Sequence, residues 1–476
     1  MRLKELFPTA TQDIDVKGLS ADSRKISSGY VFAALEGTVT DGRKYIPSAI
    51  DKGAIAVLGE DLPDDLPVPS IAVENARFAL AKAAAKFYPT QPDHMVAVTG
   101  TNGKSSTVDF LRQIWQSAGL VSASMGTLGA IGPKGAIDLG HTTPDPIAIH
   151  QTLQSLAAEG VTHGAMEASS HGLEQYRLHG VKLSAAAFTN LTQDHLDYHP
   201  TFEDYRNAKL RLVTELLPSD GTLVINADSP EKGPFEAAAR ARGQSILSVG
   251  WAGDDLKISE LMPKAVGQTL FLKWKGKDAR VDLPLIGEFQ ALNALTAAGL
   301  ALAIGLSFET VCTGLETLKP VKGRLEFVGR KSNGASVFVD YAHTPDGLDV
   351  LLRAARPHTA GRLLVVFGCG GDRDPYKRPK MGEIASRQAD KVIITDDNPR
   401  SEDPALIRQA VLSGATGAVE IGDRGAAIAS AIDQLSEGDT LLIAGKGHET
   451  GQIIGDTVLP FSDQDTALAL LQMEAV

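Results

Sequence analysis

The sequence predicts an α/β protein of three domains, a small N-terminal domain and two larger ones built on mostly parallel sheets. Its 476 residues correspond to about three domains of ~150 residues each. With 43% hydrophobic and 22% charged residues, the composition is that of a globular protein with substantial cores. Short apolar runs alternate with helical patterns along most of the chain, which is typical of doubly wound parallel sheets.

The N-terminal domain is predicted over residues 1–90. Apolar runs at 30–35 and 54–58 suit short buried strands, and an alanine-rich stretch at 74–88 suits a helix. Two prolines then prevent the helix from continuing, so 88–93 is predicted to be a linker.

The two larger domains are predicted over 91–319 and 320–476. Strand candidates in the central domain lie at 95–99, 162–166, 185–189 and 222–226. Those in the C-terminal domain lie at 336–340, 362–367, 391–395 and 440–444. Because helical stretches separate many of these runs, each domain is predicted to contain a mostly parallel sheet.

The bulk properties argue against several classes of protein. A formal net charge of −12 disfavours general nucleic-acid binding, which needs a basic excess. We find no signal-peptide pattern and no run of ~18 apolar residues without a charge, so no membrane association is expected. The two cysteines, Cys312 and Cys369, suit neither a disulfide framework nor a zinc site. A cytoplasmic protein is expected, and a monomer.

A glycine-rich loop follows the strand at 95–99 and precedes a helical pattern. Its residues are Gly100, Thr101, Asn102, Gly103, Lys104, Ser105 and Ser106. Backbone N–H groups and the helix N-terminus can hold phosphate oxygens, Lys104 can reach the terminal phosphates, and the Ser105 hydroxyl can bind Mg²⁺. Val98 stands where the usual pattern has its first glycine, so a chance glycine-rich turn stays open. The order of strand, loop and helix favours ATP binding but leaves motors, kinases and ligases possible.

Further short motifs accompany this loop in a fixed order. They are Asp22-Ser-Arg24, His141-Thr-Thr-Pro144, Glu167-Ala-Ser-Ser-His-Gly172, Asp194-His195, Ala208-Lys209, Gly323-Arg324, Asp340-Tyr-Ala-His-Thr-Pro-Asp346, Gly371-Asp-Arg-Asp374, Asp397-Asn-Pro-Arg400 and Gly445-Lys-Gly-His-Glu449. The ordered set resembles the Mur ligases, and within that family the MurE-type tripeptide synthetases. This resemblance covers nearly the whole chain.

The resemblance implies an enzyme of peptidoglycan precursor synthesis. The N-terminal domain would bind the UDP end of the substrate, a central P-loop-type domain would bind ATP with Mg²⁺, and a Rossmann-like C-terminal domain would bind the incoming amino acid. Such enzymes activate the D-glutamate carboxylate of UDP-N-acetylmuramoyl-L-alanyl-D-glutamate as an acyl phosphate. The amine of meso-diaminopimelate then attacks it. All partners implied are small molecules.

The sequence around Lys209 itself predicts that this lysine is buried. Thr201 and Asp204 form a candidate capping box for a helix that starts near Phe202. On that helix an apolar stripe shares the face of Lys209, formed by Phe202, Tyr205, Leu212, Val213 and Leu216. Burial favours a neutral amine, which can react with CO₂ to give a carbamate. The resemblance implies that carbamate as an Mg²⁺ ligand, whereas a lysine snorkelling to solvent is the alternative.

The resemblance also assigns the remaining chemistry of the central domain. Glu167 and His195 join Ser105 and Lys209 as metal ligands, although a structural histidine is the alternative for His195. The implied catalytic set is Lys104, Glu167, His195, Lys209 and Arg324. Residues implied to bind the UDP-muramoyl-peptide are Asp22, Ser23, Thr142, Thr143, Ser169, Gln175 and Arg177, and the loop 37–42 resembles part of the uridine site.

A second group of ATP-binding residues is implied near the start of the C-terminal domain. It consists of Asn293, Arg324, Asp340, Tyr341 and His343. Position 290 carries glutamine where asparagine is more usual, so Asn293 alone is assigned from that stretch. A basic side chain supplied by another domain would complete the site only after domain closure.

Arg400 carries the prediction of which amino acid is added. meso-Diaminopimelate has a distal carboxylate that lysine lacks, and an arginine fork binds a carboxylate bidentately. In the family, arginine at the end of the Asp-Asn-Pro-Arg motif marks diaminopimelate enzymes. The implied pocket is Arg373, Asp397, Asn398, Arg400, Gly445 and Glu449, with Glu449 on the distal ammonium. A helix-capping surface arginine is the alternative for Arg400.

Three rival functions remain to be weighed. Folylpolyglutamate synthase shares the ATPase and C-terminal folds but lacks a UDP-binding N-terminal domain, so residues 15–60 disfavour it. The ligase that adds D-alanyl-D-alanine is disfavoured by the Asp-Asn-Pro-Arg motif at 397–400. A catalytically inactive nucleotide-binding regulator is disfavoured because the implied catalytic lysines and metal ligands are all present.

Overall fold

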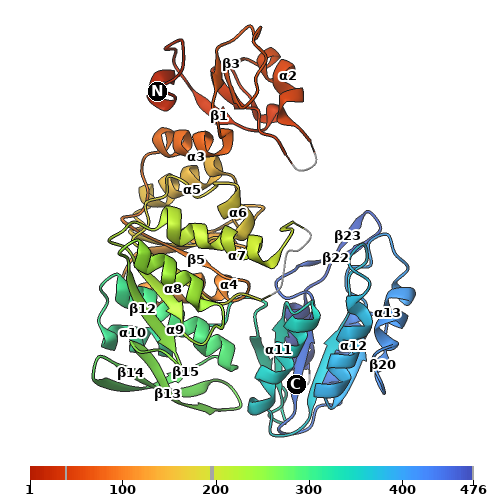
Figure 1. The fold of residues 1–476 in the computed structure, drawn as a ribbon. Coiled ribbons are helices and arrows are strands. Elements are labelled where there is room, and N and C mark those ends of the chain that lie inside the picture. Colours follow the sequence, from red (N-terminus) through yellow and green to blue (C-terminus); the bar gives the residue numbers. More distant parts are fainter. Residues whose placement is uncertain (38–39, 193–197, 474–476) are drawn as a thin grey trace. The chain divides into compact units, whose positions relative to one another are not determined.

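The computed structural model describes residues 1–37, 40–192 and 198–473 (Figure 1). The fold divides into two compact units, residues 1–257 with 295–314, and residues 258–294 with 315–476. No helix in the described residues is long and apolar enough to span a membrane.

The N-terminal part of the first unit is a four-stranded parallel sheet. Its order is β1 (Gly18–Ser20), β2 (Tyr30–Ala33), β3 (Ala54–Gly59) and β4 (Ser70–Ala72). Around it are α1 (Leu3–Leu6), η1 (Ser23–Lys25), η2 (Gly42–Tyr45), α2 (Ile46–Asp51) and α3 (Ala76–Phe87). Two separate apolar clusters form on this sheet. The strands predicted at 30–35 and 54–58 and the helix predicted at 74–88 are therefore confirmed.

The rest of the first unit is built on a larger sheet. It belongs to an eleven-stranded sheet that also includes β13 (Leu256–Pro263), β14 (Gln268–Trp274) and β15 (Lys277–Leu283). The order of the strands in this unit is β12 (Ser245–Gly250), β11 (Thr222–Asn226), β10 (Ala185–Phe188), β5 (His94–Thr99), β9 (His163–Glu167), β6 (Ser122–Gly126), β7 (Gly129–Gly132) and β8 (Gly135–Ile137). Strands β12 to β6 run parallel, and β7 and β8 continue as an antiparallel edge. The helices here are α4 (Lys104–Ser117), α5 (Pro146–Ala158), α6 (Ser170–Glu174), α7 (Phe202–Arg211) and α8 (Lys232–Ala241).

Helix α7 begins as the sequence predicts. Thr201 is its N-cap, and the Thr201 side chain accepts a hydrogen bond from the Asp204 N–H at 3.1 Å. Tyr205, Leu212 and Val213 are fully buried on the face of Lys209. The helix continues into a short π-helical turn at Leu212–Leu216. The predicted N-cap is confirmed, and among the described contacts Asp204 Oδ2 accepts the Thr201 hydroxyl (2.7 Å) rather than the backbone N–H of a full capping box. The apolar stripe is confirmed, with Phe202 and Leu216 half-buried at its ends.

The second unit contains a six-stranded sheet. Its order is β16 (Glu326–Arg330), β17 (Ser336–Asp340), β21 (Thr440–Ala444), β18 (Leu363–Phe367), β19 (Lys391–Ile394) and β20 (Val419–Glu420). All neighbours are parallel except β16. Two apolar clusters, one on each side of these strands, make it a doubly wound sheet, as predicted.

The helices of this unit are α11 (Pro345–Ala355), η4 (Arg356–His358), α12 (Lys377–Gln388), α13 (Pro404–Leu412), α14 (Arg424–Asp433) and α15 (Asp463–Met473). An antiparallel hairpin, β22 (Gly451–Ile454) and β23 (Thr457–Pro460), follows β21. A second hairpin is formed by β14 (Gln268–Trp274) and β15 (Lys277–Leu283). Strand β13 (Leu256–Pro263) and helix α9 (Glu288–Ala303) both cross the boundary between the units, and α10 (Phe308–Glu316) follows α9. Short antiparallel edges such as β16, β22 and β23 were not predicted.

His358 links three segments of the second unit through its ring. Nδ1 lies 2.7 Å from the Lys264 carbonyl oxygen, and Nε2 accepts the Gly287 N–H at 2.9 Å. Only a neutral ring protonated on Nδ1 satisfies both contacts. Burial lowers the pKa of His358 below its usual value of 6.5.

The contribution of His358 to stability should therefore be lost in acid. The unfolded chain binds the proton near pH 6.5, while the folded chain binds it only at lower pH. The contribution is complete above about pH 6.5 and declines as the pH falls through the window below it. We expect His358→Gln to lose about 1–3 kcal/mol at pH 7.5, and less at pH 5.5. Urea midpoints of both proteins across this range measure the difference; a gap that is constant with pH contradicts the prediction.

Candidate active site

The glycine-rich loop connects β5 to α4, with Gly103 as the N-cap of α4 at φ +85°. Asn190, just after β10, holds the loop in place. Its backbone carbonyl accepts the Thr101 N–H at 2.8 Å, and its side-chain oxygen accepts the Asn102 N–H at 3.0 Å. The first-turn amides of α4 have no intrahelical acceptor, so they can bind an anion at the positive end of the helix dipole. The predicted order of strand, loop and helix is confirmed.

Two ammonium groups converge on the same loop carbonyl. Lys104 Nζ donates to the carbonyl oxygens of Gly100 (3.0 Å) and Thr101 (2.8 Å). Lys209 Nζ also donates to the Gly100 oxygen, at 2.8 Å, and lies 4.5 Å from the centre of the Tyr205 ring. The Lys209 residue is only 1% exposed, which rules out the snorkelling alternative. The positive charge of Lys104 at this loop suits a polyphosphate, and the Lys209 nitrogen lies at the same carbonyl oxygen.

The carboxylate of Glu167 lies beside this loop, at the end of β9. Glu167 Oε1 accepts hydrogen bonds from the Ser105 hydroxyl and from the Thr127 N–H, each at 2.8 Å. A carboxylate and a hydroxyl are hard oxygen donors, so this pair fits Mg²⁺. His195 lies outside the described residues. Lys209 as an ammonium has no lone pair, and only its carbamate could join Ser105 and Glu167 as a ligand.

Gly126 makes room for this carboxylate. A Cβ at Gly126, the last residue of β6, would lie 2.0 Å from Glu167 Oε1 and 2.6 Å from its Cδ. Glu167 is 2% exposed, so its side chain has little space to move away. We expect Gly126→Ala to displace the carboxylate from Ser105 and to lower ATP-dependent turnover about 100-fold, the typical cost of a displacement of about 1 Å.

Gly233 provides the matched control for this substitution. It lies in α8, and an added Cβ would meet no atom within 4 Å. Gly233→Ala should keep the turnover, because the added Cβ meets no atom beyond its two neighbours in the chain; Pro234 follows it, so no gain in stability is expected. Steady-state ADP release measures both variants. Equal activity of the two would show that the close contact at Gly126 does not matter.

The residues predicted to bind the muramoyl-peptide surround the end of β9. The Thr143 hydroxyl donates to the Glu167 carbonyl oxygen (3.0 Å) and accepts the Ser169 N–H (3.1 Å). The Thr142 hydroxyl lies 3.0 Å from that of Thr127. Ser169 is also the N-cap of α6. These hydroxyl-bearing residues therefore lie close to the candidate Mg²⁺ ligands.

Arg177 adds a half-buried cation to this group. Its Nη1 donates to the Thr143 carbonyl oxygen at 2.6 Å, and its Nη2 donates to Gln175 Oε1 at 2.8 Å. Gln175 Nε2 in turn donates to the Tyr198 hydroxyl at 3.0 Å. Burial lowers the pKa of Arg177 below its usual range. Five of the seven predicted peptide-binding residues thus form one contiguous polar region.

The other two, Asp22 and Ser23, lie at the end of β1 in the N-terminal sheet. Asp22 caps η1 by accepting the Arg24 N–H at 2.9 Å, and it forms an ion pair with the Arg24 side chain at 2.9 Å. Hydrogen bonds from Arg24 lower the pKa of Asp22 to about 2. Ser23 is the first residue of η1. The loop predicted at 37–42 includes residues 38 and 39, which lie outside the described part of the chain.

In the second unit, Tyr341 is the centre of an aromatic and basic cluster. The Arg324 guanidinium lies 4.6 Å from the centre of the Tyr341 ring, and the His343 ring lies 4.6 Å from it. Asp340 accepts the N–H groups of Leu325 (2.6 Å) and Ala342 (2.7 Å), while burial raises its pKa. Burial also raises the pKa of Tyr341 and lowers that of His343. The structure brings these four predicted ATP-binding residues together.

Asn293 lies on α9, where it contacts Gln290. Asn293 Nδ2 donates to Gln290 Oε1 at 3.1 Å, and Gln290 Nε2 donates to the Arg324 carbonyl oxygen at 3.0 Å. Gln290 is thus the residue that connects α9 to Arg324. Glutamine has a longer side chain than the asparagine more usual at this position, and its amide reaches the Arg324 carbonyl oxygen. The sequence around Gln290 did not predict this contact.

The residues predicted to bind the amino acid lie at the carboxyl ends of β19 and β21. Asn398 Nδ2 donates to Glu449 Oε2 at 2.8 Å. A Cβ at Gly445, which has φ +113°, would lie 2.7 Å from Asp397 Oδ2, so the close approach of these loops requires glycine there. Lys446, which the sequence analysis did not single out, donates to both Asn398 and Glu449. Ligands of doubly wound sheets bind at this edge.

Arg400 adopts a left-handed backbone conformation, with φ +53°. Its N–H donates to the Ile453 carbonyl oxygen (3.0 Å), and its own carbonyl accepts the Gly455 N–H (2.8 Å). Its Nη1 donates to the Gly371 carbonyl oxygen at 2.7 Å. The cap of the next helix, α13, is Asp403. The helix-capping alternative for Arg400 is therefore wrong, because the hairpin β22–β23 holds its backbone.

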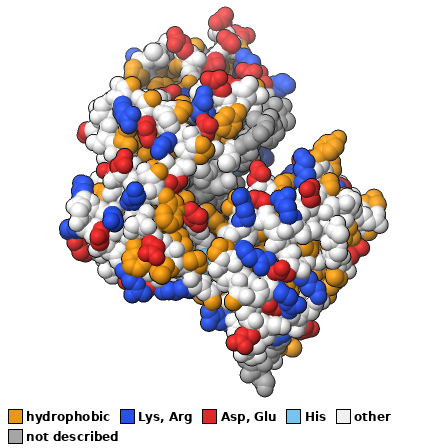
Figure 2. All heavy atoms as spheres, turned by 60° about the horizontal axis from the view of Figure 1, so that its bottom comes forward, with side chains coloured by type: hydrophobic (Ala, Val, Ile, Leu, Met, Phe, Trp, Pro, Cys, Tyr) orange, Lys and Arg blue, Asp and Glu red, His pale blue; other side chains and the backbone are white. Residues whose placement is uncertain are grey.

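Arg373 follows Asp372, another residue with positive φ (+54°), and is exposed. Its Nη1 donates only a long hydrogen bond, 3.3 Å, to the Asp372 carbonyl oxygen. Acidic and basic side chains are interspersed over the face drawn in Figure 2. Arg373 is thus an exposed cation held by one long hydrogen bond, whereas the backbone of Arg400 is hydrogen-bonded on both sides.

Comparison with known proteins accounts for most of the chain. Family models of the Mur ligases match three successive stretches: the catalytic domain model at 15–97, the middle domain model at 98–301 and the glutamate ligase domain model at 323–447. The UDP-N-acetylmuramoyl-L-alanyl-D-glutamate--2,6-diaminopimelate ligase of Bradyrhizobium diazoefficiens is 53% identical over 481 residues, covering 99% of both chains.

The enzyme of the same name from Caulobacter vibrioides is 52% identical over 480 residues, again covering 99% of both chains. A solved structure of a UDP-N-acetylmuramoyl-L-alanyl-D-glutamate--2,6-diaminopimelate ligase superposes with a TM-score of 0.76 at 32% identity, covering 100% of this chain and 99% of that one. Both the sequence and the fold are matched over their full length. The chain therefore belongs to the Mur ligase family.

Proposed function

We propose that the protein is an ATP-dependent ligase that joins meso-diaminopimelate to the D-glutamate of UDP-N-acetylmuramoyl-L-alanyl-D-glutamate, in peptidoglycan precursor synthesis. The observation that carries this proposal is the loop 397–400. There the Arg400 backbone is hydrogen-bonded on both sides to the β22–β23 hairpin, and its guanidinium donates to the Gly371 carbonyl oxygen. Asn398, two residues earlier, is bonded to the same hairpin at Ile453 and donates to Glu449. A guanidinium and a carboxylate on these neighbouring loops suit an acceptor that has a carboxylate and an ammonium on one distal carbon.

The reaction would proceed in two steps. An oxygen of the D-glutamate carboxylate forms a bond to the γ-phosphorus of ATP, the β–γ bridging bond breaks, and ADP leaves. The neutral amine of the acceptor then attacks the acyl carbon, the carbon–oxygen bond to phosphate breaks, and the nitrogen loses a proton. Both steps need positive charge around phosphate and close positioning of the reactants.

Residues of the first unit would serve the phosphoryl transfer. Lys104 would leave its loop carbonyls to reach the terminal phosphates, and the α4 amides would hold the phosphate oxygens. Ser105, Glu167 and the Lys209 carbamate would hold Mg²⁺, with His195 as a further ligand. A bound Mg²⁺ supplies charge neutralisation at the transferred phosphate. Thr142, Thr143, Ser169, Gln175 and Arg177 would hold the muramoyl-peptide, and Asp22 and Ser23 its uridine end.

Residues of the second unit would serve ATP and the acceptor. Arg324, Asp340, Tyr341, His343 and Asn293 would contact the nucleotide, with the Tyr341 ring and the Arg324 guanidinium as flat surfaces. Arg373, Asp397, Asn398, Arg400, Gly445 and Glu449 would form the acceptor pocket. We also propose that the protein is a cytoplasmic monomer and that its substrates are all small molecules.

The test is ADP release by the full chain with ATP, Mg²⁺ and UDP-N-acetylmuramoyl-L-alanyl-D-glutamate. We expect release with meso-diaminopimelate, little with L-lysine, and none when the muramoyl-peptide is omitted. Release that needs no acceptor would indicate a plain ATPase. No release with either acceptor would favour a different family substrate, such as D-alanyl-D-alanine, or an inactive regulator.

A further inference from the structure

Lys446 is a buried cation between two residues of the proposed acceptor pocket. It follows β21, its exposed fraction is 0%, and its Nζ donates to Asn398 Oδ1 (3.1 Å) and to Glu449 Oε2 (3.0 Å). Burying an ammonium is costly unless it is paired and hydrogen-bonded. The contacts with Asn398 and Glu449 therefore determine where this side chain can lie.

The two oxygens of the Glu449 carboxylate have different surroundings. Oε2 accepts from both Lys446 Nζ and Asn398 Nδ2. Within the described part of the chain, Oε1 accepts no hydrogen bond. The Glu449 side chain is 31% exposed, so the carboxylate is held from inside and still accessible. One oxygen thus has a structural role, while the other is available to a ligand.

Asn398 is fixed in the same way. Its Oδ1 accepts from Lys446 and also from the Ile453 N–H at 2.9 Å, at the start of the β22–β23 hairpin. Because its Nδ2 donates a hydrogen bond to Glu449, the whole amide has a single orientation. Lys446 is the group that touches both side chains, and it comes from the loop after β21 rather than from the loop after β19.

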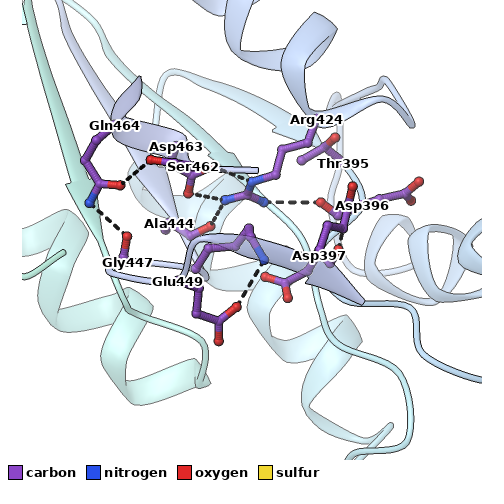
Figure 3. Close-up of polar contacts among 12 residues, drawn as sticks. Thr395, Asp396, Asp397, Arg424, Ala444, Gly447, Glu449, Ser462, Asp463 and Gln464 are labelled. Atoms are coloured by element: carbon purple, nitrogen blue, oxygen red, sulfur yellow. Dashed lines mark hydrogen bonds and ion pairs between the residues drawn. The ribbon is translucent and has the colours of Figure 1, made fainter. Parts of the chain in front are cut away.

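A second buried cation fixes the backbone beneath this trio. Arg424, at the start of α14, donates to the carbonyl oxygens of Ala444 (3.0 Å) and Asp396 (3.2 Å) and forms a bidentate pair with Asp463 (Figure 3). Ala444 ends β21, and Asp396 directly precedes Asp397. The two pocket loops are therefore held at their bases without Lys446, so removing its ammonium should change side-chain positions more than the backbone.

We propose that Lys446 is a positioning residue of the acceptor pocket, which fixes the Asn398 amide and one oxygen of Glu449 before the acceptor binds. This inference rests on the proposed function. Without Lys446, the Glu449 side chain keeps only the hydrogen bond from Asn398. More of the freedom of its three rotatable bonds is then lost when the acceptor binds, and that entropy raises the KM for the acceptor. The nucleotide and the muramoyl-peptide make no use of this pair, so their KM values should not change.

An opposite effect is conceivable, because Lys446 also competes for Glu449 with the ammonium of the acceptor. The partial exposure of Glu449 decides between the two effects. Water screens the attraction that a released carboxylate could offer, whereas the loss of order is not screened. We therefore expect Lys446→Met to raise the KM for meso-diaminopimelate about 10-fold, the equivalent of one immobilised long side chain.

The experiment measures kcat and each KM for the full-length wild type, Lys446→Met, Glu449→Ala and the double variant. If Lys446 acts through Glu449, the acceptor KM of the double variant should match that of Glu449→Ala within about 2-fold, because the effects of coupled residues do not add. Lys446→Gln keeps a donor without the charge, and should lie between wild type and Lys446→Met. It also serves as the readout if the methionine variant does not fold.

Asp439→Asn is the matched control, because it also removes a buried charge at an end of β21, but outside the acceptor pocket. Asp439 precedes β21 at its other end, is 3% exposed and pairs with Arg362 at 2.7 Å. It should lower the urea midpoint and leave the acceptor KM unchanged. A lower or unchanged acceptor KM in Lys446→Met, or effects that multiply in the double variant, would overturn the proposal. Absence of acceptor-dependent ADP release in the wild type would instead overturn the proposed function.

Discussion

Replacing Arg400 with alanine should abolish the preference for meso-diaminopimelate over L-lysine. The guanidinium would pair with the distal carboxylate, which lysine lacks. Loss of a buried, hydrogen-bonded charge partner costs about 2–5 kcal/mol, or roughly 30- to 5,000-fold in kcat/KM for meso-diaminopimelate. The kcat/KM for L-lysine should change little, since lysine makes no use of this contact. Steady-state ADP release with each acceptor measures the ratio.

Alanine is the appropriate substitution because residue 400 has φ +53°. Arginine and alanine both carry a Cβ and bear the same backbone strain, whereas glycine would relieve it. Arg400→Lys keeps the charge without the planar fork, and should retain only part of the preference. Arg353→Ala, on the exposed face of α11, serves as the unrelated control. An unchanged preference in Arg400→Ala would place the recognition of the carboxylate elsewhere, with Arg373 as the next candidate.

Replacing Arg424 with methionine should destabilise the second unit by about 3–5 kcal/mol. Arg424 and Asp463 have side chains that are 0% exposed, and both of their contacts measure 2.7 Å. Removing the cation would leave a buried carboxylate without its partner, and this is the costly case for buried ion pairs. The carbonyl oxygens of Ala444 and Asp396 would lose their donors as well. The loss is measured as a shift of the midpoint of urea unfolding of the full chain, followed by far-UV circular dichroism.

The double variant Arg424→Met with Asp463→Leu separates the cost of the unpaired charge from the value of the pair. It should be more stable than Arg424→Met alone, since no isolated charge is buried. Arg353→Met removes an exposed pair on α11, 67% and 21% exposed, and should cost no more than about 0.5 kcal/mol. If Arg424→Met were as mild as this control, the buried pair would not stabilise the unit.

Much of the first unit could be predicted from local sequence. Thr201, Asp204 and the apolar stripe of α7 are close in sequence, and together they predicted the helix on which Lys209 is buried. The glycine-rich loop was likewise predicted from the order of its neighbours. Capping, turn formation and helical periodicity depend on residues a few positions apart, so a sequence carries these signals directly.

The C-terminal site was predictable only in part. The residues around Arg400 were identified through their resemblance to the family, but the left-handed backbone of Arg400 and its pairing with Ile453 were not predicted. Lys446 lies inside a motif that assigns it no role, and no local pattern marks Arg424. Their partners are distant in sequence: Lys446 contacts Asn398, and Arg424 contacts Asp463.

The sequence by itself determined the α/β class, the parallel strands, the phosphate loop and the family resemblance, because each depends on residue types at short, regular spacing. The tertiary structure alone decided which polar groups became partners. Glu167 and Ser105 lie 62 residues apart and share a hydrogen bond only because β9 and β5 are neighbours in one sheet. Lys446 and Asn398 meet because β21 and β19 end at the same edge of another sheet. A buried charge takes whichever partner the packing of the sheet brings within reach, and local sequence does not specify that packing.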